Sequence, residues 1–141
     1  MNIGDIIPAL PGIEAEGKPM IIYFYPKDNT PGCTAEACSL RDGYEDLRKM
    51  GYAVVGISKD SEASHKKFAE KHSLPFPLVS DASTDINRAF GVWQKKKMAG
   101  REYMGTVRTT FITDADHRIT HIITKVDTKN AAAQIIDLLK E

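Results

Sequence analysis

The two cysteines of this 141-residue chain, Cys33 and Cys38, lie five positions apart. A Pro31-Gly32 pair comes directly before Cys33, in a turn that follows an apolar run ending at Pro26. Zinc ligands and thioredoxin-type redox pairs usually have two residues between their cysteines, whereas this pair has four. The spacing therefore indicates thiol chemistry of another kind.

Helical geometry limits what the two thiols can do together. On one regular helix, residues five apart are about 140° apart in rotation, and their Cα atoms are about 8.6 Å apart. A disulfide needs Cα atoms within about 7 Å. We therefore expect neither a static bridge nor a preformed chelate. The spacing suits a two-step cycle in which Cys33 is oxidised first, and Cys38 condenses with its sulfenic acid after the helix turn unwinds.

Cys33 is expected in the first turn of a helix, where free backbone N–H groups favour an anion such as a thiolate. A free thiol is about 3% ionised at pH 7, so full ionisation gains at most about 30-fold in rate. Attack on a weak electrophile needs further groups that bind the developing charge. Thr30, three residues earlier, can place its hydroxyl beside the sulfur. Arg108, which opens a predicted core strand, is the best-placed cation because strand interiors seldom hold an unpaired charge.

The elements around these residues alternate between strand and helix patterns. The predicted order is a strand at 20–25, a helix at 34–50, a strand at 52–58, a helix from 60 or 61 to 72, a strand at 77–80, a helix at 83–90, a loop or hairpin at 92–106, hairpin strands at 108–113 and 118–125, and a helix at 128–139. This order predicts an α/β domain with a mixed central sheet flanked by helices, as in the thioredoxin-like fold. Periodicity alone leaves a flavodoxin-like fold open, although the hairpin near the end argues against it.

The composition predicts an ordinary globular chain, with 42% hydrophobic and 27% charged residues. Nineteen basic residues balance nineteen acidic ones, so no basic field is expected to bind nucleic acid or a membrane. No signal peptide or membrane-length apolar run is found, which predicts a cytoplasmic protein. No shift in composition divides residues 1–141, so we expect a single domain. None of the four histidines has a spacing that pairs with the cysteines as a zinc site.

The residues around Cys33 resemble a known family. Pro26, Thr30 and Cys33 match the Pro-x3-Thr-x2-Cys motif of the peroxiredoxins. The longer string around this motif is similar to the peroxiredoxin Q subgroup, also called bacterioferritin comigratory protein. Four further segments share that likeness: GISKDS (56–61), LPFPLVSD (74–81), FGVW (90–93) and RTTFI (108–112).

The resemblance implies a thiol peroxidase with a thioredoxin-like fold over residues 1–141. Cys33 would be the peroxidatic residue that attacks hydrogen peroxide or an organic hydroperoxide. Thr30, Gly32 and Arg108 would bind the peroxide, and Pro26 would shield the sulfenic acid.

The same resemblance implies how the cycle closes. Cys38 would be the resolving cysteine, and thioredoxin or a related dithiol would reduce the resulting intramolecular disulfide. Glu36 would orient or neutralise Arg108. The resemblance implies no cofactor and no metal, and we expect a monomer because both thiols lie in one chain.

Two other classes of function stay open at this point. A disulfide oxidoreductase on the same fold would predict a Cys-x2-Cys pair, which the observed spacing disfavours. A redox sensor or metal-binding module could use the unwinding of the helix as its signal. Either cysteine could also be an inert core residue, and this reading fits Cys38 better than Cys33.

Overall fold

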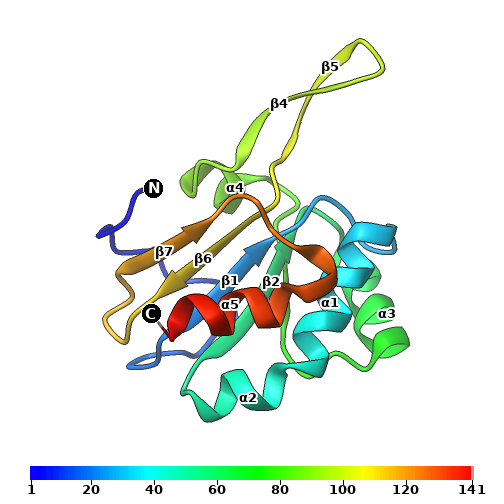
Figure 1. The fold of residues 1–141 in the computed structure, drawn as a ribbon. Helices are drawn as coiled ribbons and strands as arrows, with labels where there is room; N and C mark the ends of the chain where they lie inside the picture. Colours follow the sequence, from blue (N-terminus) through cyan, green and yellow to red (C-terminus); the bar gives the residue numbers. More distant parts are fainter. Residues whose placement is uncertain (141) are drawn as a thin grey trace.

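The computed structural model describes residues 1–140 (Figure 1). Its elements, in chain order, are β1 (Met20–Phe24), α1 (Pro31–Asp42), α2 (Tyr44–Lys49), β2 (Ala53–Ser58), α3 (Glu62–His72), β3 (Leu78–Ser80), α4 (Asp85–Ala89), β4 (Trp93–Met98), β5 (Arg101–Thr106), β6 (Thr109–Thr113), β7 (Ile119–Ile123), the 3₁₀ turn η1 (Thr128–Asn130) and α5 (Ala131–Leu139).

Five strands form the central sheet in the order β3-β2-β1-β6-β7. The strands β1, β2 and β3 run parallel, while β6 is antiparallel to both β1 and β7. This arrangement confirms the predicted mixed sheet. All five residues of β1 are buried, as expected for a central strand that reads as a continuous apolar run.

The core lies on both faces of this sheet because side chains alternate along each strand. Ile22 and Phe24 belong to one apolar cluster, together with Phe90 and Phe111. The opposite side chains of β1 belong to a second cluster, which contains Cys33 and residues of α1, α2 and α5. Figure 1 shows α1, α2 and α5 on the same face of the sheet. The predicted site therefore lies on the helix-covered face of the sheet.

The single helix predicted at 34–50 is wrong, since α1 ends at Asp42 and α2 begins at Tyr44. A side chain at Gly43, between the two helices, would collide with the Cβ atom of Ala132 on α5. The glycine thus allows α5 to pack closely against the junction. This close approach joins residues nearly ninety positions apart, and local periodicity holds no information about it.

Residues 93–106 form the two-stranded hairpin β4–β5, which confirms one of the two alternatives given for this segment. Its turn residues Ala99 and Gly100 have φ of 51° and 80°, which matches the two left-handed positions of a tight hairpin turn. Figure 1 shows the hairpin projecting from the body of the molecule. Within residues 1–140, every helix is too short or too polar to cross a membrane.

Candidate active site

Cys33 is the third residue of α1, whose first turn follows β1 through the loop 25–30. The helix begins at Pro31, and the extended residue Thr30 precedes it with φ of −88° and ψ of 152°. The Cys33 side chain is only 1% exposed and packs in the apolar cluster on the helix-covered face. The structure therefore confirms the predicted position of Cys33 in the first turn of a helix.

The guanidinium of Arg108 is in hydrogen-bond contact with the sulfur of Cys33. Its Nη2 donates to Cys33 Sγ at 3.3 Å, and its Nη1 donates to Glu36 Oε1 at 2.7 Å. Arg108 lies between β5 and β6, directly before Thr109, so the start of β6 positions the cation against the helix that carries the thiol. A Cβ atom at Gly32 would lie 3.3 Å from Nη2 of Arg108, so a side chain there would crowd the guanidinium. A purely inert core cysteine would not have a cation as its neighbour.

Glu36 is 1% exposed and lies on α1, one turn after Cys33. Burial raises the pKa of Glu36 to about 7, and the charge of Arg108 and its hydrogen bond oppose this rise. The second oxygen, Oε2, is buried without a hydrogen-bond partner among the described residues. Near neutral pH this carboxyl therefore exchanges between its neutral and its charged form beside Arg108.

Arg108 keeps its charge in this half-buried setting. Burial works against the charged form, but Cys33 and Glu36 both favour it, and the pKa of Arg108 rises above its ordinary value. A second basic side chain, Lys96 of β4, donates to the backbone oxygen of Thr106 at 2.9 Å. Burial lowers the pKa of Lys96, and the nearby charge of Arg108 lowers it further.

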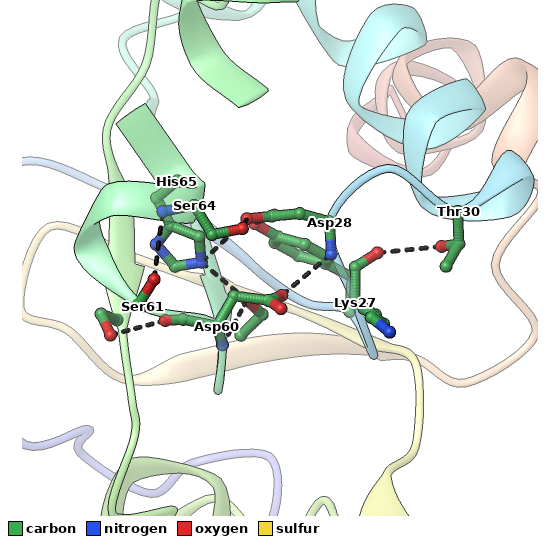
Figure 2. A network of polar contacts seen from close by, with 10 residues as sticks. Lys27, Asp28, Thr30, Asp60, Ser61, Ser64 and His65 are labelled. Atoms are coloured by element: carbon green, nitrogen blue, oxygen red, sulfur yellow. Dashed lines mark hydrogen bonds and ion pairs between the residues drawn. The ribbon is translucent and has the colours of Figure 1, made fainter. Parts of the chain in front are cut away.

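Thr30 and Pro26 lie on the loop that leads into α1. The hydroxyl of Thr30 donates to the backbone oxygen of Lys27 at 2.9 Å, a contact drawn in Figure 2. The expected placement of this hydroxyl beside the Cys33 sulfur is thus not found as a hydrogen bond among the described residues. Pro26 is partly buried, directly after the buried Tyr25.

Cys38 lies on α1 together with Cys33, as predicted, but it is partly exposed. Both thiols are free. The Cys38 sulfur lies 3.8 Å from Nδ1 of His72, the last residue of α3. No motif or spacing pairs these two residues, which are 34 positions apart in the chain.

A buried polar network ties the loop before Cys33 to α3 (Figure 2). Its centre is Asp28, which is 4% exposed. The Asp28 carboxylate accepts from the hydroxyl of Tyr25 at 2.6 Å and from that of Ser64 at 2.7 Å. The backbone N–H of Asp28 donates to Asp60 at 2.9 Å. The loop is therefore held at its middle by Tyr25 at its own start, by Ser64 of α3 and by Asp60 in the segment before α3.

Asp28, Asp60 and His65 offer oxygen and nitrogen atoms within 4.8 Å of one another, a grouping that could suit a metal ion. Both Asp28 oxygens already accept from hydroxyls, and Asp60 Oδ2 accepts from Ser58 Oγ at 2.7 Å. The Ser58 hydroxyl also lies 2.7 Å from Nε2 of His65. The arrangement is therefore a hydrogen-bonded tether. Sequence reasoning missed it because its members come from separate elements.

Comparison with known proteins identifies a family and several close relatives. Residues 11–122 match the model of the AhpC/TSA family. The chain is 44% identical to Peroxiredoxin Bcp of Bacillus subtilis over 126 residues, which covers 89% of this chain and 80% of that protein. It is 40% identical to Peroxiredoxin Bcp of Escherichia coli, which covers 100% of this chain and 97% of that protein.

Solved structures agree with these relatives. A PrxQ mutant of Xylella fastidiosa has a TM-score of 0.90 and 31% identity, over 99% of this chain and 96% of the other. A peroxiredoxin Q mutant of Xanthomonas campestris has a TM-score of 0.84 and 36% identity, over 89% of this chain and 80% of the other. These neighbours confirm the thioredoxin-like fold.

Proposed function

The chain belongs to the AhpC/TSA family of peroxiredoxins and is a thiol-dependent peroxidase, and we propose that Cys33 is the thiol that attacks the hydroperoxide. One observation supports this assignment above the others: Arg108 donates to the Cys33 sulfur at 3.3 Å in the first turn of α1. A helix N-terminus and a guanidinium together stabilise negative charge on sulfur and on a bound oxygen.

In the proposed oxidation step, the Cys33 thiolate attacks the nearer peroxide oxygen. A sulfur–oxygen bond forms, the oxygen–oxygen bond breaks, and sulfur is oxidised to a sulfenic acid. The second oxygen leaves with the electron pair and takes a proton, giving water or an alcohol. Arg108 stabilises the charge that moves onto this oxygen, while Thr30 and the Gly32 backbone position the peroxide and Pro26 shields the product.

In the proposed resolving step, the thiol of Cys38 condenses with the sulfenic acid of Cys33. A disulfide forms, the sulfur–oxygen bond breaks, and water leaves. Both residues lie on α1, so this helix must unwind locally before the sulfurs meet. An external dithiol, which we propose is thioredoxin, then reduces the disulfide. Because both thiols lie in one chain, the cycle can run in a monomer.

The proposed substrates are hydrogen peroxide and organic hydroperoxides. The bacterioferritin comigratory protein of Xanthomonas campestris has alkyl peroxide reduction activity, and this chain is 36% identical to it. Free thiols and a dithiol reductant suit a reducing compartment, and we propose the cytoplasm.

The test is mass analysis of the intact protein and its peptides, under non-reducing conditions, after one equivalent of hydrogen peroxide. We expect a loss of two hydrogen atoms and a peptide link between Cys33 and Cys38. One added oxygen on Cys33 without a link would mean that an outside thiol resolves the sulfenic acid. An unchanged mass would overturn the assignment of Cys33.

Two variants serve as controls in the same experiment. Cys33→Ser should consume no peroxide, since the attacking sulfur is gone. Cys38→Ser should still consume one equivalent and then stop before thioredoxin-supported recycling. Normal turnover of Cys38→Ser with thioredoxin would show that Cys38 is not the resolving residue.

A further inference from the structure

The imidazole of His72 is held against the thiol of Cys38 by contacts from two helices. Nδ1 of His72 lies 3.8 Å from Cys38 Sγ, a distance within reach of a sulfur hydrogen bond. Arg41, one turn after Cys38 on α1, donates from Nη1 to the backbone oxygen of His72 at 2.9 Å. The ring of Phe68 packs edge-on against the imidazole at a centroid distance of 5.1 Å. The imidazole is therefore fixed with one nitrogen facing the thiol.

We propose that His72 takes the thiol proton of Cys38 and so prepares the nucleophile of the resolving step. This inference rests on the proposed function, in which Cys38 is the resolving residue. A free thiol is only about 3% ionised at pH 7, whereas the thiolate is the species that attacks sulfenic sulfur. A neutral imidazole beside the thiol supplies the missing proton acceptor.

The atoms of this step balance without an outside reagent. The Cys38 thiol proton moves to Nδ1 of His72, and the thiolate attacks the Cys33 sulfur. The disulfide bond forms as the sulfur–oxygen bond breaks, and the departing oxygen takes a proton and leaves as water. Cys38 is oxidised and the Cys33 sulfenic acid is reduced. His72 returns its proton to solvent or to the departing oxygen.

The charged group that the structure places against this pair is Arg41. From α1, Arg41 faces both residues, and its pKa is raised first by the hydrogen bond to Asp42 and also by the charge of Cys38. From α3, Lys71 precedes His72 in the last turn of the helix. Among residues 1–140, no carboxylate forms an ion pair with His72. Arg41 also forms an ion pair with Asp42 at 3.0 Å, so both of these charges lie on the α1 side of the pair.

The position of the contact also sets the order of events. It exists while α1 is helical, so Cys38 can lose its proton before α1 unwinds. Unwinding then releases a thiolate toward Cys33. His72 acts on the resolving step alone, because its imidazole contacts Cys38, whereas the side chain that donates to the Cys33 sulfur is Arg108.

The test uses His72→Asn, which keeps a polar atom near the Nδ1 position but cannot take a proton. Rapid acid quench and mass analysis after one equivalent of hydrogen peroxide would measure sulfenic acid formation and disulfide formation separately. We expect an unchanged oxidation rate and a resolving rate about 10- to 30-fold lower at pH 7, which is the range available from thiol ionisation. Near pH 9.5 the variant should match the parent protein, because a thiol ionises there without help.

A second measurement follows the ionised fraction of the Cys38 thiol directly. In the Cys33→Ser background, Cys38 is the one remaining thiol, and its alkylation by iodoacetamide reports its ionised fraction. Adding His72→Asn should slow this alkylation at pH 7 and leave it unchanged near pH 9.5. His121→Asn is the matched control, since Nδ1 of His121 bonds instead to Thr120 on β7. It should behave as the parent in both measurements.

Two results would overturn the inference. Resolution and alkylation of His72→Asn at the parent rate at pH 7 would show that the imidazole takes no proton. An equal slowing at pH 7 and pH 9.5 would mean that His72 only packs against α1. Failure of the proposed function would look different, because the parent protein itself would then form no link between Cys33 and Cys38.

Discussion

The guanidinium of Arg108 donates to Cys33 and to Glu36 at the same time. The charge on one partner therefore changes the strength of the hydrogen bond to the other. The sequence could single out Arg108, because a charge at the start of a core strand requires a partner. It could also propose Glu36 as that partner, and the 2.7 Å contact is present. The role of the pair in turnover stays a prediction that single-residue changes can test.

The Arg108→Met change should slow the oxidation of Cys33 by much more than about 30-fold, the most that thiol ionisation supplies. The reason is that, in the proposed oxidation step, the guanidinium also stabilises the departing oxygen. Loss of free thiol under excess hydrogen peroxide measures the rate, and Arg101→Met, on the exposed hairpin, is the matched control. A defect that disappears when the pH is raised to about 9.5 would show that Arg108 acts on ionisation alone.

The Glu36→Gln change should alter the pH dependence of stability. Burial raises the pKa of Glu36 from 4.5 to about 7, so the folded state holds this proton more tightly than the unfolded state. The resulting stabilisation is fully present below about pH 4.5 and is lost as the pH rises through about 7. Relative to the Gln variant, the wild-type free energy of unfolding should fall by up to about 3 kcal/mol over this range.

Urea unfolding of both proteins at pH 4.5, 6 and 8 would measure this difference. The Gln variant keeps a side chain of the same size and an oxygen that can accept from Arg108. Two parallel stability curves would show that Glu36 does not titrate in the range that its buried position implies.

At the scale of elements, the sequence predicted the order of strands and helices, because periodicity and turn residues are local signals. The hairpin at 114–117 and the helix beginning after Ser61 were predicted in this way, and both are present. The close packing of α5 at Gly43 and the tether at Asp28 could not be predicted. Each depends on an element that only tertiary packing brings close.

The Gly43→Ala change should destabilise the fold by about 1–3 kcal/mol, the usual cost of overpacking. The added methyl group would collide with Ala132 on α5. Denaturant unfolding measures the effect, and a double-mutant cycle with Ala132→Gly isolates its cause. The two changes together should cost less than the sum of the single changes. If the two destabilisations are strictly additive, the collision with Ala132 is not the cause of the Gly43→Ala effect.

At the scale of the whole molecule, one sheet supports both apolar clusters, and β1 contributes side chains to each. Displacement of β1 would therefore expose apolar side chains of both clusters at once. We therefore predict that residues 1–141 form a single domain with one cooperative unfolding transition. Far-UV circular dichroism and the fluorescence of Trp93, the only tryptophan, should give the same denaturant midpoint. Two separate midpoints would contradict the prediction.

The presence of both thiols on one twelve-residue helix, next to a loop anchored through Asp28, has a kinetic consequence. In the proposed cycle, Cys38 would act, once α1 opens, as a nucleophile on a short tether whose other end is fixed. Tethers of this kind give an effective concentration on the order of millimolar. A small thiol in solution would have to reach that concentration to capture the sulfenic acid first. The proximity of the two cysteines in the chain would then protect the oxidised enzyme from mixed disulfides.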